Sequence, residues 1–78
     1  MKEKWEQWID KNPIRLALTK EGMTQTEMAS RVGVTINTIH KWLSGISQPK
    51  EENMRAIEKV LNTDINDQMD QWVKNKPS

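Results

Sequence analysis

The stretch from Thr24 to Gly45 constrains the fold more than any other, because helix start and stop signals follow one another closely within it. Thr24 is followed three residues later by Glu27, a capping box in which each side chain satisfies a free backbone N–H at a helix start. Gly33 then ends that helix, since glycine adopts a left-handed C-cap at little cost. Thr35 can cap a second helix. The stretch therefore predicts two short helices joined by a tight turn.

Apolar residues recur at helical spacing on both sides of the turn, which predicts one buried face on each helix. The second helix is expected over residues 35–43. Small residues at Ala29 and Gly33 let the two helices cross closely at a steep angle. This is the helix-turn-helix arrangement, whose second helix can enter the major groove of DNA. The expected buried positions are Met28, Ala29, Val32, Ile39, Trp42 and Leu43.

Four side chains of the second helix are left pointing outward, and their chemistry suits base edges: Ile36, Asn37, Thr38 and Lys41. Asn can bond the edge of adenine, Thr can bond bases or phosphates, and Ile can pack on the thymine methyl group. Polar residues on an outward helix face are also common on ordinary protein surfaces. Within a helix-turn-helix, we expect these four residues to contact DNA bases.

The chain carries the signature G-M-T-Q-T-E-M-A-x-x-V-G-V-T-x-x-T-I-x-x-W-L-S-G, followed by Pro49. Over roughly residues 13–61, it resembles the Cro/CI-type helix-turn-helix domains of phage repressors and their bacterial relatives. The resemblance implies a lambda-repressor-like fold, a phosphate contact from Gln25, and a recognition surface that begins at Thr35. The loop after Gly45 would lie beside the DNA backbone. The expected phosphate contacts are Thr24, Gln25, Thr35, Ser44, Ser47 and Lys50.

The chain departs from this family's pattern in two places. Many members pair an Arg late in the first helix with a Glu late in the recognition helix, and the matching positions here are Leu18 and Leu43. An ion pair replaced as a whole by packed apolar residues is often neutral or stabilising, so the expected fold is unaffected. Lys50 stands where many members have a Ser or Thr cap, and we expect Ser47 or Gln48 to cap the next helix instead.

With 78 residues, the chain is expected to form one domain over residues 1–73, followed by a disordered tail over 74–78. It contains no Phe, Tyr or Cys and no long Val/Ile/Thr alternation, so we expect neither a sheet nor a disulfide. The expected fold is all-α, a compact bundle of about five to six short helices. No run is apolar enough to span a membrane, and we expect a cytoplasmic location in a bacterial or phage-infected host cell.

The N-terminal segment is amphipathic, with Trp5 and Trp8 on one face of a helix expected within residues 2–11. These tryptophans either cover the core or form a partner or dimer surface, where Trp is a preferred anchor. Asn12 and Pro13 are strong signals for the start of the next helix.

The C-terminal segment predicts a helix over residues 64–73, capped by Thr63 or Asp64. Its apolar residues form a narrow stripe, which serves either packing within the monomer or dimerisation.

The net charge of the chain is only +1, but the charged residues are distributed unevenly along it. Residues 22–50 carry three Lys/Arg and one Glu, a net +2, while residues 51–78 carry four Lys/Arg and six Asp/Glu, a net −2. The positive part coincides with the expected DNA-binding stretch, but its charge is low for a nucleic-acid binder. We therefore expect few phosphate contacts per monomer and a homodimer on DNA.

Catalytic and metal-binding patterns are missing from the sequence. There is one His, no Cys and no Gly-rich phosphate loop, so we expect no enzyme, cofactor or metal. We expect His40 to be a surface or phosphate-facing residue. Asp64, Asp67 and Asp70 are interpreted as a solvated helix face.

These observations predict a sequence-specific double-stranded DNA-binding transcriptional regulator, a repressor of phage or mobile-element type that binds a palindromic operator. The alternative is a helix-turn-helix fold that serves protein interaction, as an antitoxin or as a regulator bound through its Trp5/Trp8 helix. The chain could also be the DNA-binding fragment of a longer protein.

Overall fold

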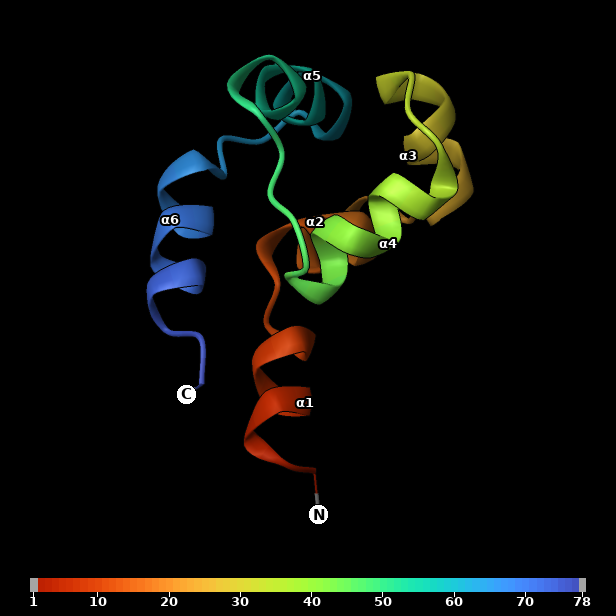
Figure 1. Ribbon diagram of the computed structural model, residues 1–78. Helices are drawn as coiled ribbons and strands as arrows, with labels where there is room; N and C mark the ends of the chain where they lie inside the picture. Colours follow the sequence, from red (N-terminus) through yellow and green to blue (C-terminus); the bar gives the residue numbers. More distant parts are fainter. Residues whose placement is uncertain (1, 78) are drawn as a thin grey trace.

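The computed structural model describes residues 2–77, which form six α-helices and no strand. This confirms the expected all-helical class. In Figure 1, α3 and α4 lie on the right of the molecule, α6 lies on the left, and α1 extends downward below α2 and α4. The helices are α1 (Lys4–Asp10), α2 (Pro13–Glu21), α3 (Gln25–Val32), α4 (Ile36–Ser44), α5 (Glu51–Leu61) and α6 (Asn66–Lys74).

Side chains cap α2, α3 and α4 at the positions that the sequence predicts. Asn12 Oδ1 accepts hydrogen bonds from the first turn of α2. Thr24 Oγ1 accepts from the Glu27 backbone N–H at 3.1 Å, and Thr35 Oγ1 accepts from the Thr38 N–H at 3.2 Å. Each such cap stabilises its helix by about 1 kcal/mol, so the start of every helix in the central stretch is set locally.

The start of α5 differs from expectation. Lys50 occupies the N-cap position, and no side chain, including those of Ser47 and Gln48, bonds to the first turn. The first turn instead contains Glu51 and Glu52, whose negative charges favour the positive end of the helix dipole.

The start of α6 also differs from expectation. The helix begins at Asn66, two residues later than predicted, and neither Thr63 nor Asp64 caps it. The Oε2 atom of Glu58, near the end of α5, accepts a hydrogen bond from the Ile65 N–H at 3.0 Å. A side chain from the preceding helix therefore satisfies a donor that the sequence assigned to a local cap.

The core contains apolar side chains from all six helices. Met28, Ala29, Ile39, Trp42 and Leu43 are buried as predicted, while Val32 is only partly buried and packs against them. Leu18 and Leu43, which replace the ion pair of the family pattern, are both buried in this core. Burying a leucine contributes about 1.5–3 kcal/mol, so the departure from the pattern is compatible with a stable fold.

The end helices pack against each other through Trp8 of α1 and Trp72 of α6. Their rings are stacked at a centroid distance of 3.9 Å and an interplanar angle of 2°. Each indole N–H donates to the other residue's backbone carbonyl at 2.7 Å. The apolar stripe of α6 thus packs within the chain, and Trp8, which is 6% exposed, is not accessible as a partner surface. Trp5 remains 42% exposed.

The C-terminal tail begins one residue later than expected, because Lys74 is the last residue of α6. The backbone N–H of Asn75 donates to Gln71 and that of Lys76 donates to Val73, at 3.1 and 3.2 Å. Disorder in the remainder of the tail stays a prediction, and Ser78 lies outside the described residues.

Candidate nucleic-acid interface

Helix α4 has one face in the core and the other in solvent. Ile39, Trp42 and Leu43 are buried, whereas Asn37 and Lys41 are exposed on the opposite side. Ile36, in the first turn, is 39% exposed although it is apolar. The face contains a cation and no carboxylate, so it can approach a phosphate-lined groove without like-charge repulsion.

The predicted base contacts differ in their exposure and in whether their polar groups already form hydrogen bonds within the protein. Thr38 is partly buried, and its hydroxyl oxygen lies 3.0 Å from that of Thr35. The Thr35 hydroxyl also accepts the Thr38 N–H as the helix cap. Both hydroxyls therefore help to hold the start of α4. If either hydroxyl also bonded to DNA, the same oxygen atom would have to serve both the DNA and the cap.

His40 also belongs to the outward face, as expected for a surface or phosphate-facing residue, although it is not among the predicted base contacts. It is exposed and lies one helical turn after Ile36 and one before Ser44. Ser44 is partly buried, and its hydroxyl donates to the Lys41 carbonyl at 3.3 Å. The helical period alone would have identified His40, since residues 36, 40 and 44 recur every four positions.

The N-terminus of α3 forms the second part of the interface. Thr24 is exposed and Gln25 is partly buried, and both line one hollow of about 270 Å³. The Thr24 hydroxyl accepts the Glu27 N–H at 3.1 Å and donates to the Glu27 carboxylate at 3.3 Å. The expected second half of the capping box, a bond from the Thr24 backbone N–H to the Glu27 side chain, is therefore replaced by a bond between the two side chains. The free backbone N–H groups of the first helical turn and the positive end of the helix dipole favour an anion at this point.

Arg15 of α2 lines the same hollow, and the sequence did not indicate this. Its Nε atom is buried and makes no hydrogen bond among residues 2–77. Among the described residues, Arg15 is the only cationic side chain that borders this hollow, so its guanidinium adds positive charge beside the start of α3. Arg15 precedes Gln25 by more than two helical turns in sequence, so only the packing of α2 on α3 brings them together.

The loop between α4 and α5 carries the remaining predicted phosphate contacts. Ser47 is partly buried, and its backbone N–H donates to the Lys41 carbonyl at 3.3 Å. Lys50 is exposed, but it borders a shallow depression together with Glu51 and Glu52. Arg55 borders the same depression and forms an ion pair with Glu51, so these four side chains carry no net charge and the positive potential at Lys50 is reduced.

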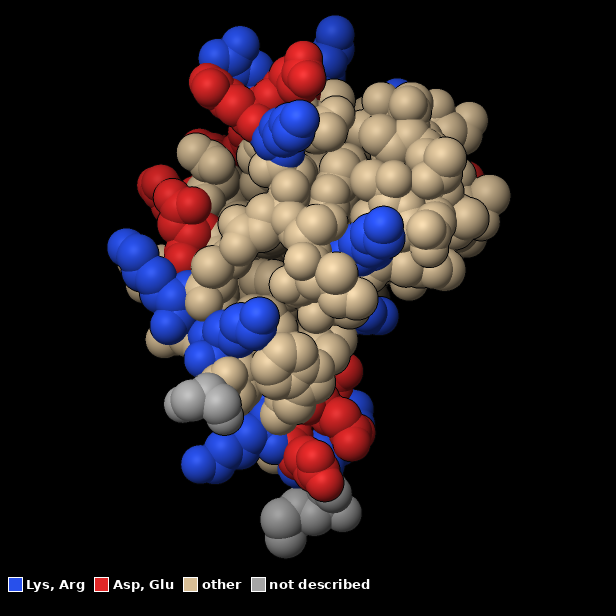
Figure 2. Space-filling view, in the orientation of Figure 1, with Lys and Arg blue, Asp and Glu red and all other residues tan. Residues whose placement is uncertain are grey.

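The distribution of charge separates the interface from the rest of the surface. Residues 28–50 contain Arg31, Lys41 and Lys50 and no Asp or Glu. On the face that Figure 2 shows, acidic side chains gather over α5, α6 and α1, and the area over α3 and α4 is nearly free of them. The part of this face that presents α4 therefore carries little negative charge that would repel a polyanion.

Other site types find little support within residues 2–77. No group of three or more His, Asp or Glu side chains is arranged to hold a metal ion. None of the helices described is long and apolar enough to cross a membrane.

Comparison with protein-family models matches residues 14–68 to a family described as helix-turn-helix. Searches of curated protein sequences and of solved structures give no match. The matched residues include α3, the turn and α4, and they make up more than half of the chain. Together with the fold, the match establishes that this chain belongs to the Cro/CI-type helix-turn-helix family of DNA-binding domains.

Proposed function

We propose that this protein is a sequence-specific transcriptional regulator that reads the DNA major groove with α4. The observation that carries the proposal is the outward face of α4. It combines an amide, a cation and an exposed apolar side chain, at Asn37, Lys41 and Ile36, with no carboxylate nearby. Asn and Lys supply hydrogen bonds to base edges, and Ile gains burial against a thymine methyl group.

Phosphate contacts would position α4 in the groove. Gln25 and Arg15 border one hollow at the start of α3, where an amide, a guanidinium and free backbone N–H groups can share a phosphate. Few cations are present in this region, so one monomer would release few counterions on binding. A homodimer doubles these contacts and reads two half-sites about one helical turn apart, which favours a palindromic operator.

The proposed regulatory effect is repression. A domain seated in the major groove excludes other proteins from the same base pairs, and this requires no further activity. The resemblance to phage repressors supports a role of phage or mobile-element type in the cytoplasm of a bacterial or phage-infected cell.

The test is selection of bound duplexes from a random pool at near-physiological salt, followed by affinity measurements on the enriched sequence. We expect a two-fold-symmetric site. Asn37→Ala should relax base preference at one position of each half-site, whereas Gln68→Ala, an exposed amide on α6, should change nothing. Equal weakening by Asn37→Ala on all sequences would make Asn37 a positioning residue.

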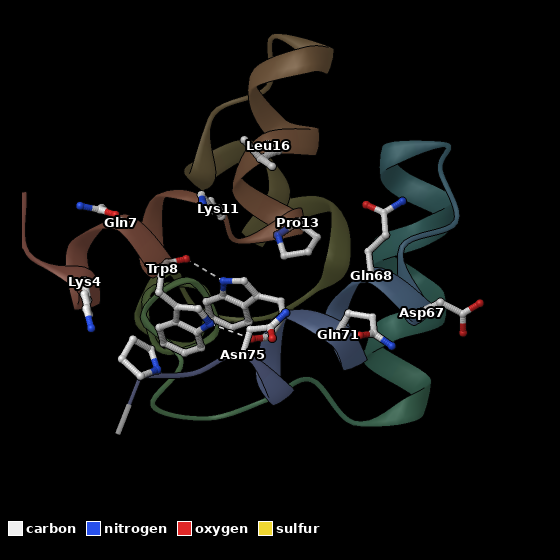
Figure 3. Close-up of a pocket in the computed structure, with 12 residues that line it drawn as sticks. Lys4, Gln7, Trp8, Lys11, Pro13, Leu16, Asp67, Gln68, Gln71 and Asn75 are labelled. Carbon is white, nitrogen blue, oxygen red and sulfur yellow. Dashed lines mark hydrogen bonds between the residues drawn. The ribbon is translucent and has the colours of Figure 1, made fainter.

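A pool without any enriched sequence would favour the second candidate function, a helix-turn-helix fold used for protein interaction. A groove of about 780 Å³ between α1, α2 and α6 supports this candidate. Figure 3 shows residues that line it, among them Pro13 and Leu16 of α2 and Gln68 and Gln71 of α6. Leu16 is 55% exposed, so a partner could gain apolar burial there.

A further inference from the structure

One buried side chain joins the ends of two helices. Asn12 has no exposed surface. Its Oδ1 accepts hydrogen bonds from the N–H groups of Ile14 and Arg15 at 2.8 and 3.2 Å, at the start of α2. Its Nδ2 donates to the carbonyls of Trp42 and Leu43 at 3.2 and 3.5 Å, in the last turn of α4. Asn12 therefore connects the beginning of α2 with the end of the recognition helix.

The end of α4 needs such a donor. The last four carbonyls of a helix have no partner within it. At the C-terminus of α4, the Ile46 N–H bonds to the Lys41 carbonyl at 3.0 Å and the Gly45 N–H bonds to the Trp42 carbonyl at 3.4 Å. The carbonyl of Leu43 is left for Asn12. The same bond brings the positive end of α2 to the negative end of α4, which is electrostatically favourable.

The stacked tryptophans touch the same end of α4. A Cβ atom built on Gly45 would lie 2.5 Å from Trp8 Cη2 and 3.3 Å from Trp72 Cη2. The rings cannot easily move away, because each is held by the stack and by the indole N–H bond to the opposite backbone (Figure 3). The Asn12 hydrogen bonds and the two tryptophan rings thus restrain the C-terminal end of α4 independently of each other.

Trp8, Asn12 and Trp72 make these contacts, and all three residues lie outside the residues that match the family model, 14–68. We infer that Trp8, Asn12 and Trp72, together called the clasp, are positioning residues for DNA binding. They set the orientation at which α4 is presented to the groove. The inference rests on the proposed function, and it assigns to the end helices a role in base readout rather than in stability alone.

The physical reason is that α4 is short and is held at two ends. The turn after α3 holds its N-terminal end, and the clasp holds its C-terminal end. If the clasp is loosened, α4 can pivot about its first turn, so Lys41, a proposed base contact, is displaced more than Ile36 and Asn37, and its placement relative to them changes. Base contacts need placement to within about 0.5 Å, whereas attraction to phosphates tolerates larger errors. Loosening should therefore reduce specificity more than non-specific affinity.

The test compares Asn12→Ser with Asn62→Ala. Serine can still cap α2, but its short side chain cannot reach the carbonyls of α4. Asn62 ends α5 in a left-handed conformation, so its replacement lowers stability at a residue that takes no part in the Asn12 hydrogen bonds or the tryptophan stack. Affinities for the selected duplex and for a scrambled duplex are measured by anisotropy, at a temperature where circular dichroism shows every variant folded.

We expect Asn12→Ser to lower the ratio of specific to non-specific affinity about tenfold, with non-specific affinity changed by less than about twofold. Asn62→Ala should lower the melting temperature and leave the ratio unchanged. If Asn12→Ser lowers the melting temperature but keeps the wild-type ratio, Asn12 is only a stabilising residue and the inference is overturned.

A second variant covers the case in which Asn12→Ser does not fold. Trp72→Phe keeps an aromatic ring in the stack and removes one N–H donor, and the affinity ratio should again fall. An unchanged ratio in this folded variant would equally overturn the inference.

Failure of the proposed function would look different, because the wild-type protein would then show equal affinity for every duplex. In that case, amide chemical shifts of the free protein still test the clasp. Asn12→Ser should move the shifts of the last turn of α4, and Asn62→Ala should not.

Discussion

The contact between Gly45 and the tryptophan pair makes one stability prediction that the structure specifies in detail. Gly45 ends α4 with a φ of +79°, in the left-handed region, and its hydrogen faces the edge of the Trp8 ring. Gly45→Ala therefore adds two separate costs. One is backbone strain, because an L-residue is disfavoured at this φ. The other is steric overlap, because the new methyl carbon would lie 2.5 and 2.8 Å from two ring carbons of Trp8.

The two costs can be estimated separately. A left-handed conformation costs an L-residue roughly 1–2 kcal/mol. Inserting a methyl group into a packed site costs about 1–3 kcal/mol, and here the neighbouring ring is held by a stack and a hydrogen bond. Gly45→Ala should therefore lower the free energy of unfolding by about 2–5 kcal/mol. For a domain of this size, each kcal/mol corresponds to a melting-temperature shift of about 4–8 °C.

Gly22 provides a matched control within the same chain. It also ends a helix with a positive φ, +66°, but a Cβ atom there would meet nothing within 4 Å. Gly22→Ala should lose only the strain, roughly 1–2 kcal/mol. Urea unfolding followed by circular dichroism gives both free energies. Equal losses for the two variants would refute the argument that the tryptophan pair presses on the end of α4.

A double-mutant cycle then identifies the ring responsible. Phenylalanine lacks the outer benzo carbons of tryptophan, so in a Trp8→Phe background the added methyl group at Gly45 has space. Gly45→Ala should cost about 1–3 kcal/mol less in that background than in the wild type. If the effects of Gly45→Ala and Trp8→Phe on the free energy of unfolding are additive, the steric cost does not come from the Trp8 ring.

Three further predictions concern charges and caps. Arg15→Gln should weaken binding to all duplexes and reduce the slope of log affinity against log salt by about one, measured by anisotropy titration; an unchanged slope would mean that Arg15 meets no phosphate. Thr35→Ala should lower the free energy of unfolding by ~1 kcal/mol in urea titration, because the Thr38 N–H loses its acceptor, whereas Thr26→Ala, at an exposed helical position, should not lower it. The hydrogen bond and charge of Asp10 raise the pKa of Lys2, and any stabilisation from this pair would be present below the ordinary lysine pKa and lost as pH rises through the raised value. Both residues are exposed, so Asp10→Asn should leave the melting temperature at neutral pH unchanged, and a clear drop would contradict this.

Features set by short-range interactions could be predicted from the sequence, and they include most of the candidate site. The caps at Asn12, Thr24 and Thr35 lie within three residues of the N–H groups they satisfy. The burial of Ile39, Trp42 and Leu43 follows from helical period alone, and so does the outward position of Asn37 and Lys41.

Predictions failed or were incomplete where the partner comes from another element. The sequence predicts a start of α6 that is two residues too early, because the N–H of Ile65 is satisfied by Glu58 of α5 and not by a local cap. The sequence does not distinguish a core position from a partner surface for Trp8, because the residue that buries it, Trp72, is far away in sequence. Arg15 was not singled out because its place beside Gln25 depends on how α2 packs on α3.

The sequence by itself thus determined that this chain is helical, where its helix-turn-helix begins and ends, and which side chains α4 turns outward. These properties depend on backbone capping and helical periodicity, which act over a few residues. Only the tertiary structure decided how α4 is held. The Asn12 amide, the tryptophan stack and Gly45 lie far apart in sequence, and they meet only after the end helices have packed.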